Sequence, residues 1–98
     1  MLDVLFHPEA QSEYEISRDW YLARSVQAAT RFEIAVEHAL DTIAGNPEFY
    51  PQYDELHRFA VLRRFPFSIV YQILPEGIYV VAIAHSSRAP GYWQDRVS

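Results

Sequence analysis

Cations and aromatic rings gather near the C-terminus, where they could bind a nucleic acid or a protein partner. The cluster follows the last predicted strand and contains Arg88, Tyr92, Trp93 and Arg96. Guanidinium groups bind phosphates and carboxylates, and flat rings stack on nucleobases or anchor a protein partner. The same residues could instead serve the fold, with the rings covering an open edge of the core and the arginines paired with acidic residues of the helices. Both interpretations stay open, and each can hold for different residues.

A histidine at the end of the same predicted strand adds a possible proton donor. His85 lies three residues before Arg88, a spacing that could place a general acid beside a phosphate-binding cation. A lone histidine at a strand end is more often only a hydrogen-bonded residue. The other histidines, His7, His38 and His57, match no spacing of a metal motif, so we expect no metal and no cofactor.

The N-terminal half of the chain predicts a short strand followed by two helices. Residues 2–6 alternate weakly, and Pro8 can open a helix that runs to about residue 24. Ser25 can cap a second helix, whose apolar residues form one stripe at period 3.6. This helix should stop at Gly45 and the Asn-Pro pair that follows it, because glycine tolerates the left-handed terminal turn and proline cannot continue a helix.

The C-terminal half predicts a loop and three strands. Residues 46–57 contain two prolines and three aromatic residues, and we expect a loop whose rings hold it against the core. Runs of β-branched and aromatic residues predict strands at 58–64, 67–74 and 78–85. Short connections make the last two strands an antiparallel hairpin, and the two helices should bury their stripes on one face of the sheet. The expected fold is α+β, of order βααβββ, with a small, mainly antiparallel sheet.

The composition favours one packed domain over residues 1–98. Ninety-eight residues suffice for one core and exclude a second domain, and half of them are hydrophobic. The chain has no cysteine, which rules out disulfides, thiolate metal sites and a cysteine nucleophile. No apolar run is long enough to cross a membrane, and no targeting segment precedes the first strand. We therefore expect a cytoplasmic protein with no membrane partner.

Charge is unevenly distributed along the chain. Residues 1–57 hold eleven acidic residues and three arginines, a net charge of −8, whereas residues 58–98 hold five arginines and two acidic residues, a net charge of +3. Every cation except histidine is an arginine, whose planar fork suits carboxylate, phosphate and aromatic partners. With an overall pI of about 5.2, the protein is poorly suited to bind a nucleic acid with densely packed phosphates, such as ribosomal RNA, because many phosphates would have to be neutralised.

Residues 63–96 resemble the C-terminal half of the RelE/ParE superfamily of toxins from bacterial toxin-antitoxin operons. The resemblance rests on Arg64, Phe65, Pro66 and Phe67 before the hairpin, and on His85, Arg88, Pro90 and Trp93 after it. It implies the α+β fold described above. It also implies a small antitoxin from the same operon, whose C-terminal segment wraps around the toxin as helix and extended chain. Arg63 and Arg64 are then candidates for pairing with acidic antitoxin residues.

Ser68 favours one branch of this superfamily. In the ribonuclease branch that RelE typifies, the residue after the aromatic matched by Phe67 is commonly an arginine that helps to hold the scissile phosphate, and serine offers no such charge. The resemblance therefore favours the ParE branch, which poisons DNA gyrase through protein contacts and needs no catalytic residue. The expected surface for target or partner comprises Arg63, Arg64, Arg88, Tyr92, Trp93 and Arg96.

Two alternatives stay open. The chain could be a RelE-like messenger RNA endoribonuclease that acts with the ribosome, using Arg64, His85, Arg88 and Tyr92 for phosphate binding and proton transfer. It could also be a degenerate toxin that only binds antitoxin, which would bind without being toxic. Fold membership alone does not decide between these functions.

Overall fold

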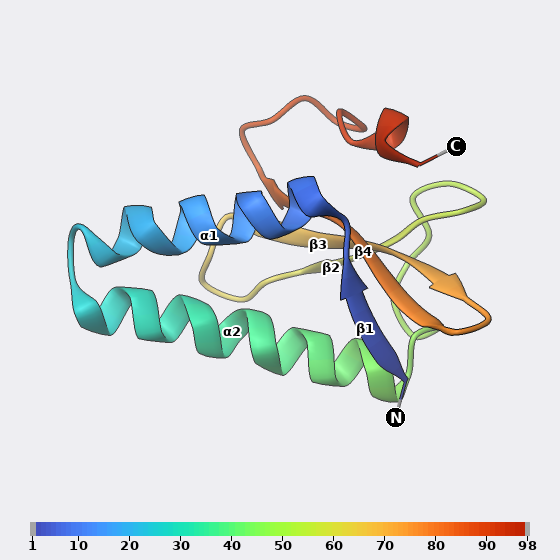
Figure 1. Cartoon of the computed structure of the whole chain (residues 1–98), viewed down its shortest axis with the longest axis horizontal. Helices are drawn as coiled ribbons and strands as arrows, with labels where there is room; N and C mark the ends of the chain where they lie inside the picture. Colours follow the sequence, from blue (N-terminus) through green and yellow to red (C-terminus); the bar gives the residue numbers. More distant parts are fainter. Residues whose placement is uncertain (1, 98) are drawn as a thin grey trace.

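Two antiparallel helices pack on one face of a four-stranded sheet in the computed structural model, which describes residues 2–97 (Figure 1). The elements are β1 (Asp3–Phe6), α1 (Pro8–Leu22), α2 (Val26–Gly45), β2 (Arg58–Val61), β3 (Phe67–Leu74), β4 (Gly77–His85) and a short 3-10 helix, η1 (Gln94–Arg96). This arrangement confirms the predicted α+β class and the order βααβββ. No helix in the described part of the chain is long and apolar enough to cross a membrane.

The sheet has the strand order β1-β4-β3-β2, with β1 parallel to β4 and the other pairs antiparallel. β1 stops at Phe6, opposite Val80, so the second half of β4 has no strand on that side. A bulge leaves Val81 without a partner in β3, because Val80 pairs with Tyr71 and Ala82 pairs with Val70. The bulge makes Val81 and Ala82 neighbours in one cluster, whereas Val80 belongs to the core beneath the helices.

Local hydrogen bonds explain where the helices begin. His7 caps α1 through Nδ1, which accepts from the backbone N–H of Glu9 at 3.0 Å, and Pro8 occupies the first helical position, where its missing N–H costs nothing. Ser25 caps α2 as predicted, because its hydroxyl accepts from the N–H of Ala28 at 3.2 Å. α2 ends at Gly45 as predicted, and α1 ends at Leu22, slightly before the predicted boundary.

The core between helices and sheet is built around aromatic rings. Tyr14 and Tyr21 of α1 stack on Phe32 of α2, which is fully buried. Tyr71 of β3 is also fully buried, and its hydroxyl donates to the carbonyl of Pro47 at 2.5 Å. This bond fastens the start of the loop after α2 to the sheet, and burial raises the pKa of Tyr71 to about 12.

One strand boundary and the packing of one loop also differ from the sequence expectation. The strand predicted over 58–64 ends at Val61, because the chain turns sharply and Arg64 adopts a left-handed backbone with φ of 68°. In the loop over 46–57 the three rings do not all hold the core. Tyr50 packs against it, whereas Phe49 is 71% exposed and Tyr53 makes an edge-to-face contact with Trp93 instead.

Candidate partner-binding surface

Glu13, on the inner side of α1, accepts four hydrogen bonds from the sheet and the C-terminal segment. Arg96 donates to both carboxylate oxygens, from Nη1 at 2.9 Å and from Nη2 at 2.8 Å. The hydroxyl of Tyr92 donates to Oε2 at 2.6 Å, and the backbone N–H of Ile83 donates to Oε1 at 3.0 Å. Such bidentate, charge-assisted bonds fix both partners in one geometry.

The position of this cluster follows from the short first strand. Where β1 ends, the backbone groups of β4 that face its edge need other partners. Glu13 accepts from the N–H of Ile83, and Arg96 donates from Nη1 to the carbonyl of Val81 at 3.0 Å. The ion pair therefore covers the open edge of β4, with Arg96 only 9% exposed and Glu13 15% exposed.

Hydrogen bonding sets the protonation of this cluster. Burial by itself raises the pKa of Glu13, but the bonds from Arg96, Tyr92 and the Ile83 amide outweigh it and hold the pKa below its ordinary value. Burial, followed by the bond to Glu13, raises the pKa of Tyr92 well above the usual range. At neutral pH Glu13 is a carboxylate and Tyr92 a neutral phenol that is already donating its proton.

Trp93 anchors the C-terminal segment on the second face of the sheet. Its ring is 3% exposed and packs with Val70, Val81 and Ala82, away from the helices. Figure 1 shows the segment after β4, drawn in red at the top of the view, on the side away from α2. The ring of Trp93 is thus not presented for stacking on a nucleobase. Both residues are placed as expected if they serve the fold: Trp93 covers the sheet, and Arg96 pairs with a carboxylate of a helix.

A second polar cluster ties the loop over 46–57 to the same segment. The Nδ1 of His57 lies 2.9 Å from Asp54 Oδ1, and Gln94 donates to Asp54 Oδ2 at 3.1 Å. His57 is buried, with its ring 4.6 Å from that of Trp93. Burial alone would raise the pKa of Asp54, but the bonds from His57, Gln94 and two backbone amides lower it to about 2.

Arg88 is the exposed cation of the predicted C-terminal cluster. Its side chain is 53% exposed, and its guanidinium carbon lies 3.9 Å from the centroid of the Tyr92 ring. Its Nη1 lies 3.9 Å from Glu13 Oε2, beyond hydrogen-bond distance. Arg88 therefore rests on a ring that is itself bonded to Glu13, with its charge open to solvent.

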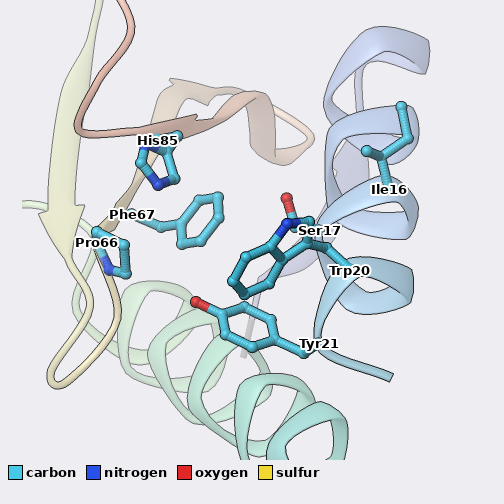
Figure 2. Close-up of a pocket in the computed structure, with 7 residues that line it drawn as sticks. All are labelled: Ile16, Ser17, Trp20, Tyr21, Pro66, Phe67 and His85. Atoms are coloured by element: carbon cyan, nitrogen blue, oxygen red, sulfur yellow. The ribbon is translucent and has the colours of Figure 1, made fainter. Parts of the chain in front are cut away.

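His85 lies between two clefts. Figure 2 shows it beside Pro66 and Phe67, in a cleft of about 320 Å³ bordered by Trp20 and Tyr21 of α1. On its other side a cleft of about 220 Å³ includes Arg88 and Tyr92. The Nδ1 of His85 accepts from the N–H of Ser87 at 3.0 Å, so a neutral ring carries its proton on Nε2.

Comparison with known families decides the family of this chain. The model of the ParE toxin of the type II toxin-antitoxin system, parDE, matches residues 4–90, which contain both helices, β2, β3, β4 and all of β1 except Asp3. The chain belongs to the ParE toxin family. The resemblance to RelE/ParE toxins and the preference for the ParE branch are both confirmed.

A solved structure of the chromosomal ParDE toxin-antitoxin system from P. aeruginosa has the same fold as this ParE-family toxin. The two share 16% sequence identity with a TM-score of 0.61, over 87% of this chain and 96% of that chain. At this identity the likeness shows the fold alone. No curated protein sequence matches the toxin.

Arg63 and Arg64 lie apart from the C-terminal cluster of the toxin. Both are exposed, and they line a groove of about 680 Å³ with Arg31 and His38 of α2. The four residues of the nuclease alternative are therefore divided, with Arg64 in this groove and the other three around the clefts at His85.

The sequence did not single out Glu13 or Arg31. Glu13 does fall on the inward stripe of the first predicted helix, between Ala10 and Tyr14, and a carboxylate in that position requires a buried partner. Arg31 has no such signal, because its groove forms only when the connection after β2 lies beside α2.

Proposed function

We propose that this ParE-family toxin inhibits DNA gyrase through protein contacts and that an antitoxin from the same operon neutralises it. Membership of the family of parDE toxins supports a partner antitoxin. Gyrase and its DNA lie in the cytoplasm, so the proposal includes a cytoplasmic site of action. The observation that carries a binding role is the exposed, pre-positioned cation at Arg88.

The arrangement beneath Arg88 suits recognition of a partner. Its guanidinium lies over the ring of Tyr92, and Tyr92 is fixed by its bond to Glu13. A side chain held in place in this way loses less conformational entropy on binding than a free arginine does. Because the charge of Glu13 is already satisfied by Arg96, Arg88 keeps its own charge available for a carboxylate of the target.

The groups that a nuclease would use are engaged elsewhere. The hydroxyl of Tyr92 donates to Glu13, and Nδ1 of His85 accepts a backbone N–H. Arg64 lines a different groove from either of them. This division supports binding over phosphate chemistry, which requires its groups within hydrogen-bond reach of one reacting centre.

The remaining residues of the predicted surface take different parts in the proposal. Arg63 and Arg64 are proposed to contact the antitoxin, and Arg88 with Tyr92 to contact gyrase. Trp93 and Arg96 hold the segment that carries Arg88, through the sheet and through Glu13. Direct contact of these two with a partner stays a prediction.

A cleavage assay with purified gyrase tests this proposal. Relaxed or supercoiled plasmid is incubated with gyrase, ATP and the toxin, and trapped complexes are opened with detergent and protease. We expect linear DNA that depends on the toxin. Arg88→Ala should raise the concentration needed by about tenfold or more, as for an arginine at the centre of an interface. Arg18→Ala is the control, because it removes a half-buried arginine that pairs with its neighbour Asp19, lies over the ring of Tyr14 and belongs to neither predicted surface.

The opposite result is equally specific. If the toxin leaves gyrase unaffected and cuts messenger RNA on programmed ribosomes, the ribonuclease alternative replaces this proposal. If it does neither but binds antitoxin, the chain is a degenerate toxin.

A further inference from the structure

The arginines of this toxin divide into two groups by their contacts. Within residues 2–97, five of the eight have partners in the chain: Arg18 with Asp19, Arg24 with Trp20, Arg58 with the carbonyls of Glu48 and Tyr50, Arg88 with Tyr92, and Arg96 with Glu13. The other three are Arg31, Arg63 and Arg64. Among the described residues their side chains make no hydrogen bond, ion pair or cation–π contact, and all three line one groove.

We call this groove the arginine trough. Its α2 side carries Arg31, Ile34 and His38, and its other side is the connection after β2 with Arg63, Arg64 and Phe65. Arg31 and His38 lie two turns apart on a face of α2 that is separate from the buried stripe. On the opposite side, two cations follow each other in the chain, which turns at the left-handed backbone of Arg64.

The trough is long enough for a peptide segment. Its volume of about 680 Å³ continues into a second hollow of about 240 Å³, which shares His38 and Arg63 and reaches Thr42. From Ala28 to Thr42 the length along α2 is about 21 Å at 1.5 Å per residue. Each hollow is lined by one exposed apolar side chain: Ile34, 60% exposed, in the larger and Val61, 67% exposed, in the smaller.

The chemistry of the trough selects an acidic and partly apolar occupant. No carboxylate lines either hollow in the described part of the chain, although the whole chain has a net charge of −5. Exposed aliphatic side chains favour a peptide over a nucleic acid, which would stack its bases on exposed aromatic rings. The negative charge of the rest of the chain also opposes a long polyanion.

We infer that the arginine trough docks a segment of the antitoxin in which carboxylates flank apolar side chains. This inference rests on the proposed neutralisation by an antitoxin. It adds Arg31, Ile34, His38 and Val61 to the antitoxin surface. It also separates that surface from Arg88, which lines another cleft.

The test measures the affinity of the full-length toxin for the antitoxin encoded in the same operon. In the triple variant Arg31→Glu, Arg63→Glu and Arg64→Glu, we expect the Kd at physiological salt to rise more than about tenfold, since three exposed ion pairs become repulsive. Added salt should weaken the wild-type complex more than the variant complex. Arg18→Glu is the matched control and should change the Kd less than about twofold.

Folding and alternative partners are checked in the same experiment. Circular dichroism establishes that the variant is folded, and the milder triple change to glutamine gives a second comparison. A folded variant with wild-type affinity would show that the arginine trough does not dock the antitoxin, while leaving the proposed function standing. Failure of the wild-type toxin to bind the antitoxin would instead defeat the proposed neutralisation. Stronger arginine-dependent binding of a single-stranded RNA oligonucleotide would show that the class of partner is wrong.

Discussion

Replacing Glu13 by glutamine tests whether this carboxylate holds the C-terminal segment on the sheet. Four donors point at its two oxygens, from Arg96, Tyr92 and the Ile83 amide. Glutamine has one acceptor oxygen, and its amino group would face donors. The guanidinium of Arg96, 9% exposed, would also lose its counter-charge.

The structure sets the size of the effect. Breaking one partner of a buried ion pair costs about 3–5 kcal/mol, and the partial exposure of Glu13 brings the expected loss to about 3 kcal/mol. Domains of this size have only about 5–15 kcal/mol of total stability. For a domain of this length the loss corresponds to a fall in Tm of roughly 12–24 °C.

Thermal and urea unfolding, followed by near-ultraviolet circular dichroism of the Trp93 environment, measures this loss. Glu9→Gln is the matched control, because Glu9 also approaches Arg96, at 3.7 Å from Nε, but is 65% exposed. Glu9→Gln should lower the free energy of unfolding by less than about 0.5 kcal/mol. If Glu13→Gln is no more costly than Glu9→Gln, the cluster does not hold the segment and the account of Arg88 loses its support.

Three other predictions concern the turn at Gly77, the loss of stability at low pH and the double variant of Glu13 and Arg96. Gly77→Ala should destabilise the protein by at least about 1–3 kcal/mol in urea unfolding, because Gly77 has φ of 148° and an added Cβ would collide with the carbonyl of Asp3 in β1; an unchanged midpoint would refute the close approach of β1 and β4. The pKa of Asp54 is lowered on folding from 3.8 to about 2, so its contribution is complete above about pH 4 and is lost as pH falls toward 2. Asp54→Asn should therefore be less stable than wild type at neutral pH, and its free energy of unfolding should change less between pH 4 and 2. An equal change for variant and wild type over this range would contradict this. Removing both charges with Glu13→Gln and Arg96→Met should cost less than the sum of the single changes, a non-additivity that a double-mutant cycle reads directly.

Local patterns in the sequence predicted most of the elements of this fold. The stripe of α2 and the cap at Ser25 depend only on neighbouring residues, and so does the hairpin of β3 and β4. The early end of β2 could not be predicted, because the run over 58–64 stays compatible with a strand until the turn at Arg64. The left-handed turn at Arg64 decides that boundary, and strand propensity gives no sign of it.

The sequence was enough to name most residues of the candidate surface, but it did not show which of them face a partner and which hold the fold. Arginine and tryptophan after the last strand suit both a partner surface and a cover for the sheet. Burial of Arg96 follows from the short β1, which leaves the edge of β4 to be satisfied by Glu13 and Arg96, whereas Trp93 is buried against the second face of the sheet. That requirement exists only in three dimensions, and so does the trough that brings Arg31 beside Arg63.

The most direct test of gyrase inhibition is to induce this toxin without its antitoxin and to follow DNA and protein synthesis separately by incorporation of labelled precursors. The account predicts an early fall in DNA synthesis, accompanied by a DNA-damage response, while protein synthesis continues. An immediate fall in protein synthesis with DNA synthesis maintained would contradict it, and growth without any change in either would do so as well.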